Sequence, residues 1–183
     1  MPEADHERLK LALDMTHHRD AIFSSTCPEH FVPTAGVAIV VKHPMRAIRL
    51  KPRSRELEGA ICTGRIALNH LCLGAGIGFN HFNAYGWSGG HENHVAASRT
   101  DCLFVAIQAE CRYRKGTAAM IPGDVHADPG DISALDGMLK EEGWTDLGGN
   151  GHRWGAVRSG CCHMVFVPST PAVRIEVVEP YAG

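Results

Sequence analysis

The sequence predicts one layered domain of mixed helices and strands, an α/β or α+β fold. Short apolar runs rich in β-branched residues alternate with segments whose apolar residues recur at helical spacing. The length of 183 residues is that of one domain with a sizeable core. Hydrophobic residues make up 44% of the chain and charged residues 21%, a balance that excludes a largely disordered protein.

Residues 1–35 are predicted to form an N-terminal helix and loop, and residues 36–183 the layered domain. The helix covers residues 5–15, where leucine and alanine side chains recur at approximate helical spacing. Residues 17–33 contain prolines together with several serines and threonines, a composition typical of a loop.

The first half of the domain is predicted to consist mainly of strands. Residues 36–41 are an apolar, β-branched run typical of a buried strand. Further strands are predicted at 46–51, 59–68 and 78–85, with a polar loop between the first two of these. The glycines at 74–78 predict a flexible turn before the last strand.

A longer helix is predicted from Ser98 to about Arg112, because Ser98 and Asp101 resemble a capping box. Its apolar face carries Leu103, Phe104, Ile107 and Cys111. The remaining predicted elements are a strand at 118–123, a loop at 124–131, a helix at 132–143 and strands at 164–167 and 173–178.

Charge and cysteine content narrow the function classes. The 18 Lys and Arg against 20 Asp and Glu give a formal net charge of −2, which excludes a protein that coats nucleic acid by charge alone. No run approaches the ~20 apolar residues of a membrane span, and the N-terminus has no apolar signal core, so an intracellular protein is expected. The seven cysteines show no CxxC spacing, and reduced thiols are expected.

The clearest chemistry lies in the stretch Met120-Ile-Pro-Gly-Asp-Val-His-Ala-Asp-Pro129. An apolar strand ends here in Gly123 and Asp124, which fixes a carboxylate where the chain turns into a loop. Alternation along the extended segment places Asp124 and His126 on one side. A carboxylate and an imidazole so placed can hold a hard cation and a phosphoryl oxygen together.

This stretch, with the helix and the Glu142-Gly-Trp-Thr-Asp-Leu147 that follow it, resembles the GD-x-N-A-x-P segment of the endonuclease/exonuclease/phosphatase superfamily. The segment Phe82-Asn-Ala-Tyr-Gly86, the glycine-rich loop after it and the helix containing Arg99 fit the same pattern, as does the tail around His163-Met-Val-Phe-Val167. The resemblance implies a two-sheet α/β sandwich. It also implies Mg²⁺- or Mn²⁺-dependent cleavage of phosphoester bonds, with nucleic acid or another phosphoester as the substrate.

The resemblance implies roles for individual residues. Asp124 matches the aspartate that orients or deprotonates the attacking water, and it is the candidate metal ligand. His126 stands where the family has an asparagine that contacts the phosphate, and Tyr85 matches a tyrosine near the scissile phosphate. Asn83, on the same strand face as Tyr85, and Arg99 are candidates for substrate binding.

Several family motifs have no counterpart in the sequence. These are the N-terminal strand with its asparagine, the next strand with its metal-binding glutamate, and the C-terminal Ser-Asp-His. In the penultimate strand the expected acidic residue is absent from Cys161-Cys-His-Met164. We therefore expect a sandwich that is incomplete at both ends. Such a chain is a truncated, catalytically impaired hydrolase-like domain, for example the remnant of a mobile-element endonuclease.

Two other interpretations stay open. One is a non-catalytic domain that keeps the fold and binds nucleic acid or protein, and the other is an unrelated α/β binding domain. In structural terms, Asp124 also suits a turn, His126 a solvated loop and Tyr85 a half-buried sheet position. His91 and His94 invite a zinc hypothesis, but no spaced cysteine pair accompanies them.

Overall fold

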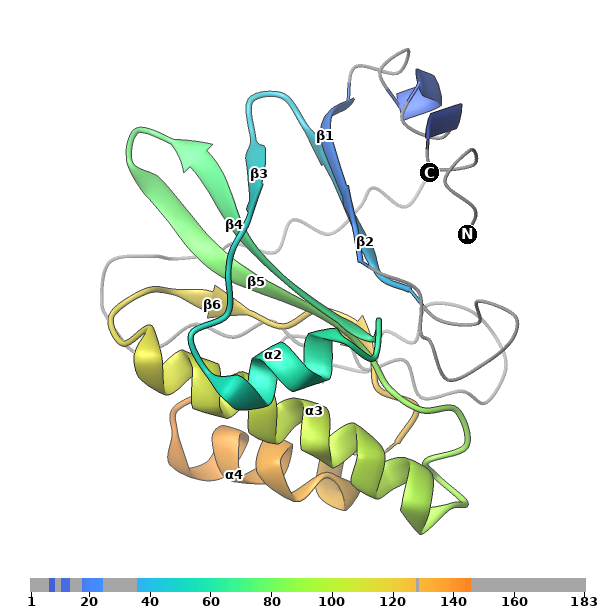
Figure 1. Cartoon of the computed structure of the whole chain (residues 1–183). Helices are drawn as coiled ribbons and strands as arrows, with labels where there is room; N and C mark the ends of the chain where they lie inside the picture. The colour runs from blue at the N-terminus through green and yellow to red at the C-terminus, as the bar shows by residue number, and fades with distance from the viewer. Residues whose placement is uncertain (1–6, 9–10, 14–17, 25–35, 128, 146–183) are drawn as a thin grey trace, which may run out of the picture.

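The computed structural model describes residues 7–8, 11–13, 18–24, 36–127 and 129–145 (Figure 1). Within this part of the chain there are two β-sheets, with helices packed on one face of the larger sheet. None of the helices in it is both long and apolar enough to cross a bilayer. The strands predicted at 164–167 and 173–178 lie outside the described residues.

The smaller sheet pairs β1 (His18–Phe23) with β2 (Ala38–Lys42) in antiparallel fashion. The larger sheet has the order β3-β4-β5-β6, and β7 also pairs with β5. Its strands are β3 (Arg46–Arg49), β4 (Ile66–Gly74), β5 (Ile77–Tyr85), β6 (Ala119–Met120) and β7 (Gly123–Asp124). The first three run antiparallel, whereas β6 and β7 lie parallel to β5.

Three helices in the described part of the chain form one layer beneath the larger sheet, as Figure 1 shows. They are α2 (Arg55–Ile61), α3 (His94–Tyr113) and α4 (Ser133–Glu141), and a 3₁₀ turn, η1 (Pro129–Asp131), precedes α4. The central helix α3 contacts both α2 and α4, so the layer is continuous. It covers the sheet face that β4 and β5 present to it.

The core lies on both faces of the larger sheet. The cross-strand pair Leu68 and Phe82 belongs to the main apolar cluster, which the helical layer completes with residues such as Phe104. The pair Leu71 and Phe79 belongs to a smaller cluster with apolar side chains of β2. Because side chains alternate along a strand, these two pairs point to opposite faces of the sheet. The sheet is therefore buried from both sides.

The predicted fold class and most predicted elements are confirmed. Strands occupy the regions predicted at 36–41, 46–51 and 78–85, and α4 lies within the helix predicted at 132–143. The region predicted as one strand at 118–123 contains two short strands, β6 and β7. The helices are expected to bury Phe104, Ile107, Leu135 and Leu139; the first three are buried, and Leu139 is half-buried against the core. Residues 7–8 and 11–13 are helical, in agreement with the helix predicted at 5–15.

The loop predicted at 17–33 is wrong at its start, where β1 occupies His18–Phe23. The sequence of this strand, HRDAIF, is half polar and shows no run of apolar residues. It becomes a strand because it pairs with β2 over most of its length, from His18 opposite Lys42 to Phe23 opposite Ala38. Local composition carries no signal of this long-range pairing.

The polar connection after Lys51 and the start of the strand predicted at 59–68 are also wrong, because they contain α2. The Ser54 hydroxyl caps this helix by accepting the Leu57 N–H at 3.1 Å. Leu57 is fully buried in the main core, which anchors this short polar helix to the sheet. The strand itself begins at Ile66.

The predicted capping box at Ser98 is wrong, since α3 begins one turn earlier. Its N-cap is Asn93, whose side chain accepts from the backbone N–H groups of Val95 and Ala96. Asp101 has a different role: its carboxylate accepts the Ala134 N–H at 2.7 Å and so satisfies the beginning of α4. The N-cap position of α4 is an isoleucine, which offers no side-chain cap of its own.

Two glycines allow the ends of β5 and β7 to lie unusually close together. A Cβ atom at Gly123 would overlap the carbonyl oxygen of Ala84, and one at Gly86 would overlap the carbonyl oxygen of Val125. Any larger residue at either position would push the two strands apart. These glycines therefore bring residue 124 against the end of β5.

Candidate functional site

The candidate site is formed where β5 and β7 end side by side. In their parallel register Tyr85 lies opposite Asp124, and Ala84 lies opposite Gly123. The pairing is tied by Ala84 N–H donating to the Pro122 carbonyl at 3.1 Å and by Gly86 N–H donating to the Asp124 carbonyl at 2.7 Å. Residues in register on neighbouring strands point to the same face, so the sheet brings the phenol and the carboxylate together.

Asp124 holds the turn that follows the strand, through contacts with His126. One oxygen of its carboxylate accepts the backbone N–H of His126 at 3.3 Å, and the other lies 3.2 Å from His126 Nε2. The second contact becomes an ion pair when the ring is protonated, although its geometry is not that of a hydrogen bond. The side chains of Asp124 and His126 are 28% and 17% exposed. Both groups are therefore partly shielded from solvent yet reachable.

The imidazole of His126 also contacts the phenol ring. The ring centroids of Tyr85 and His126 are 5.1 Å apart with planes nearly perpendicular, an edge-to-face arrangement. The backbone of His126 has a φ of +53°, in the left-handed region. This turn directs the imidazole back toward the strand ends. The structure thus brings together the three residues predicted as catalytic, Tyr85, Asp124 and His126.

Arg65 and Trp87 border the same site, and the sequence analysis missed both. The Arg65 guanidinium lies 4.5 Å from the Trp87 ring centroid and 5.5 Å from that of Tyr85. Its Nη1 donates to the Gly86 carbonyl at 2.7 Å, and the backbone N–H of Trp87 donates to the Thr100 hydroxyl at 3.0 Å. A lone arginine before a strand carries no sequence signal, because its partners lie some twenty residues away in the chain.

The two predicted substrate-binding residues take no part in the contacts described for this group. The Asn83 side chain donates to the Ala38 carbonyl at 2.7 Å and so ties β5 to β2. Arg99 is exposed on α3. The contacts that join Tyr85, Asp124 and His126 include neither of them.

The described residues do not fit the divalent cation that the family resemblance implies. Both carboxylate oxygens of Asp124 already face His126. In the described ranges, no group of three or more His, Cys, Asp or Glu side chains is arranged to hold a metal ion. Mg²⁺ and Mn²⁺ prefer several oxygen ligands, and carboxylates above all.

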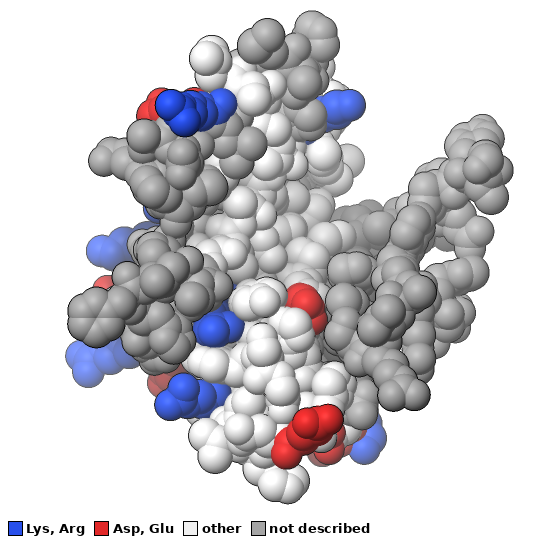
Figure 2. Space-filling model, turned by 90° about the vertical axis from the view of Figure 1, so that its right-hand side faces the viewer, with Lys and Arg blue, Asp and Glu red and all other residues white. Residues whose placement is uncertain are grey.

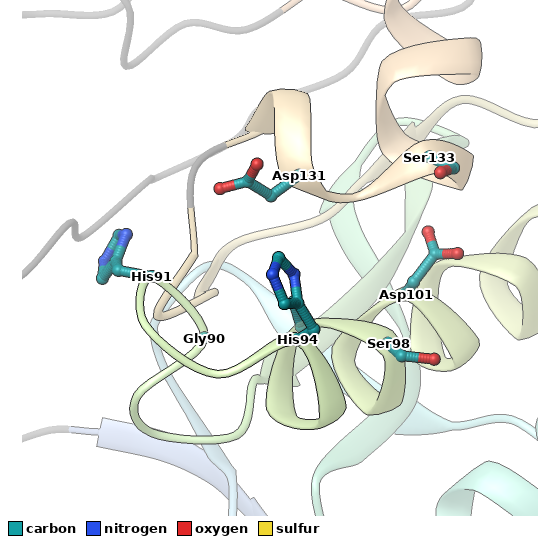
Figure 3. A pocket seen from close by; sticks show the side chains of 8 residues that line it. Gly90, His91, His94, Ser98, Asp101, Asp131 and Ser133 are labelled. Atoms are coloured by element: carbon teal, nitrogen blue, oxygen red, sulfur yellow. The ribbon is translucent and has the colours of Figure 1, made fainter.

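A polar pocket of about 280 Å³ lies next to the candidate site (Figure 3). It is lined by Gly90, His91, His94, Ala97, Ser98, Asp101, Asp131 and Ser133. Its closest link to the site is Gly90, where a Cβ would press on the backbone oxygen of His126. In Figure 3 the His94 ring points toward Asp131, while Asp101 points toward the start of α4. None of the five predicted site residues lines this pocket.

The charges on the face in Figure 2 are scattered. The Lys and Arg side chains drawn in colour show as separate groups rather than as one continuous stripe. Nucleic-acid grooves usually concentrate cations along the path of the phosphate backbone. The described residues visible in this view do not form such a path.

No protein-family model matches the chain, and no curated protein matches it in sequence. Among solved structures, it is similar to the human Nocturnin catalytic domain with bound sulfate, with a TM-score of 0.50 at 12% identity, over 87% of this chain and 63% of that one. A β-hairpin deletion mutant of β toxin from Staphylococcus aureus gives a TM-score of 0.51 at 11% identity, over 99% of this chain and 78% of that one. The chain therefore spans less than two thirds of the Nocturnin chain.

Both solved proteins are members of the endonuclease/exonuclease/phosphatase superfamily. Identities this low establish a shared fold and leave function to be argued from the site. The two sheets, the helical layer and the placement of Gly123 and Asp124 after β5 agree with the sequence resemblance. The chain has the fold of the endonuclease/exonuclease/phosphatase superfamily.

Proposed function

We propose that this chain is a phosphoester-hydrolase-like domain that binds a phosphate ester at Tyr85, Asp124 and His126 and hydrolyses it weakly or not at all. The observation that carries the proposal is the register of β5 and β7, which sets Tyr85 beside Asp124 and, through the following turn, beside His126. These are the residues that the resemblance assigns to the reacting phosphate. The fold supports the assignment.

Each of the three side chains has chemistry suited to a phosphate. The Tyr85 hydroxyl donates a hydrogen bond, and the imidazole of His126 donates one or carries a proton. The Asp124 carboxylate accepts a proton from a water molecule or holds that water in line with phosphorus. Because Asp124 also accepts the backbone N–H of His126, it fixes the turn that presents the imidazole.

Weak turnover follows from the charges that the described site lacks. Cleavage of a phosphoester builds negative charge that enzymes neutralise with cations held by clustered carboxylates. The described residues supply one such carboxylate, Asp124. Losing one electrostatic partner of this kind costs on the order of a hundredfold in rate. The same observation favours the second candidate function, a binding domain that keeps the fold without catalysis.

The test measures hydrolysis of plasmid DNA, RNA and bis(p-nitrophenyl) phosphate with Mg²⁺ or Mn²⁺. We expect rates near background, and any activity of the chain should fall about a hundredfold or more in Asp124→Asn. Asp131→Asn is the matched control, since this exposed carboxylate lines the neighbouring pocket rather than the site. Robust turnover that survives Asp124→Asn would contradict the assignment of the site.

A binding measurement tests whether the site takes a phosphate ester at all, which both candidate functions require. Titration with phenyl phosphate, followed by calorimetry, should show binding that weakens in His126→Ala, whereas Asp124→Asn, which removes a negative charge beside the anion, should not weaken it. Binding without turnover supports the non-catalytic function. Absence of binding, with and without Mg²⁺, would overturn the phosphate-ester proposal altogether.

A further inference from the structure

Arg65 is a buried cation with no acidic partner in the described part of the chain. The residue is 7% exposed, and the ion pairs formed among the described residues do not include it. Its Nη1 donates to the Gly86 carbonyl, whereas its Nε is buried without a hydrogen-bond partner. Arginine is almost never buried unless it is paired. Packing alone therefore does not explain why a charged side chain is buried at position 65.

The aromatic contacts alone do not supply that reason. Stacking on Trp87 and Tyr85 stabilises the guanidinium. A neutral side chain of similar volume would fill the same space without the penalty of removing a charge from water. What the arginine adds is a fixed positive charge against the ring of Tyr85, which in turn contacts His126. The charge is thus held beside the candidate site.

We infer that Arg65 balances the negative charge of a phosphate group bound at this site. The inference rests on the proposed function and deepens it. Arginine cannot lose its proton in a protein, and a charge shielded from solvent acts on a nearby anion more strongly than it would in water. The ligand class is a phosphate monoester or diester anion whose binding requires no metal.

Arg65 is a positioning residue in this scheme, because it acts through Tyr85. The described residues place few carboxylates around Asp124, and the Arg65 guanidinium next to the Tyr85 ring has no acidic partner among them. Binding of a phosphate anion without a metal would explain both features. A site that needs no metal needs no carboxylate cluster. A site that binds an anion leaves a cation unpaired until the ligand arrives.

The experiment is calorimetric titration of the full chain with phenyl phosphate in excess EDTA, at low and at higher ionic strength. Arg65→Met removes the charge and keeps much of the volume, and Arg65→Lys keeps the charge without the planar stack. Arg112→Met is the matched control, because this arginine on α3 has a 63% exposed side chain. Folding of each variant is checked by circular dichroism and thermal unfolding.

The chain should bind phenyl phosphate in EDTA, and the affinity should fall as ionic strength rises. Arg65→Met should weaken binding about tenfold or more, Arg65→Lys should recover part of the loss, and Arg112→Met should bind as the unchanged chain does. A merely structural role predicts that the Lys and Met variants fail alike. Equal losses in both, or no loss in Arg65→Met, would overturn the inference.

The unchanged chain provides a test that does not depend on how the variants fold. If it binds phenyl phosphate with Mg²⁺ and not in EDTA, the role of Arg65 is refuted while the proposed function survives. If it binds in neither condition, both fail. If binding in EDTA is lost in His126→Ala and retained in Arg65→Met, the site stands and the charge-balancing residue is another one.

Discussion

His81 is a histidine kept neutral inside the larger sheet. It lies opposite Asn69 in the pairing of β4 with β5, and burial lowers its pKa to about 4, despite a backbone hydrogen bond that works in the other direction. The unfolded chain binds a proton near pH 6.5, where the folded chain does not. The folded state therefore loses stability as the pH falls from about 6.5 to about 4.

We predict that His81→Leu removes this pH dependence. Between pH 6.5 and 4 the unchanged chain should lose roughly 3 kcal/mol of unfolding free energy that the variant keeps. Urea unfolding at a series of pH values measures the difference. The exposed His94 is the control, and His94→Gln should follow the unchanged chain. Parallel curves for the His81 variant and the unchanged chain would show that His81 titrates normally.

Glu110 is a fully buried carboxylate that joins α3 to the start of α2. It accepts the backbone N–H groups of Arg53 and Ser54, and Arg114 donates to it at 2.6 Å. Burial works to raise the pKa of Glu110, but these hydrogen bonds and the Arg114 charge outweigh it and lower the pKa. The stabilisation is therefore present above the ordinary carboxyl value and is lost as the pH falls through the lowered one.

We predict that Glu110→Gln costs about 3 kcal/mol of unfolding free energy at neutral pH, because the amide nitrogen would face backbone donors. The gap to the unchanged chain should close as the pH falls below about 4.5. Glu58→Gln, at an exposed position of α2, should change stability by less than about 0.5 kcal/mol. Equal losses in both variants would contradict the role of Glu110.

At the scale of elements, the close approach of β5 and β7 is the feature on which the candidate site depends. We predict that Gly123→Ala destabilises the chain by about 2 kcal/mol or more, because the added methyl overlaps the backbone of Ala84. Gly137→Ala is the matched control within α4, where a Cβ meets no neighbour. There the same change should stabilise by about 0.5–1 kcal/mol.

The two glycine variants also show whether the strand contact affects ligand binding independently of its effect on stability. Gly123→Ala should weaken phenyl phosphate binding even under conditions where most molecules remain folded, since it moves Asp124 and the His126 turn that Asp124 holds away from Tyr85. Gly137→Ala should bind as the unchanged chain does. Undiminished binding by a folded Gly123→Ala variant would show that the strand contact does not position the carboxylate.

Elements were predictable where their signal is local. The apolar run at 36–41 and the apolar alternation at 78–85 predict strands. The spacing of Ile132, Leu135 and Met138 predicts a helix. The elements that sequence reasoning missed depend on distant partners. β1 requires β2, and α2 requires the buried position of Leu57 together with Glu110 from α3.

The residues of the candidate site were likewise predictable where their signal is local and not where it depends on distant partners. Tyr85, Asp124 and His126 could be singled out because each ends or follows a strand and matches a family position. Arg65 and Trp87 could not, since their role arises only when the start of β4 packs against the segment after β5. Asn83 matched the strand face expected of it, yet its hydrogen bond to Ala38 gives it a sheet-bridging contact.

At the scale of the whole molecule, more buried apolar side chains lie on one face of the larger sheet than on the other in the described part of the chain. The larger cluster lies between the sheet and the helices and contains side chains of β4, β5, α3 and α4. In the described part of the chain, the cluster on the other face has three buried members, Ile39, Val41 and Leu71. Stability should follow this division, because resistance to local opening scales with buried apolar contact.

We predict that hydrogen exchange resolves two levels of protection. Amides of central β4 and β5 should exchange only with global unfolding, while those of β1 and β2 should exchange faster through opening of the smaller sheet. Mass spectrometry of peptic peptides at several urea concentrations measures both rates. Uniform protection across the two sheets would show that they unfold as one unit.

The left-handed backbone at residue 126 decides which amino acids can replace one another there. With a φ of +53°, the position tolerates glycine, asparagine, aspartate and histidine and disfavours β-branched residues. Asparagine, which the related fold has at this place, and the histidine of this chain both belong to that small set. One base change interconverts their codons. The chain is therefore one mutational step from an amide at the proposed phosphate contact, and that step leaves the turn undisturbed.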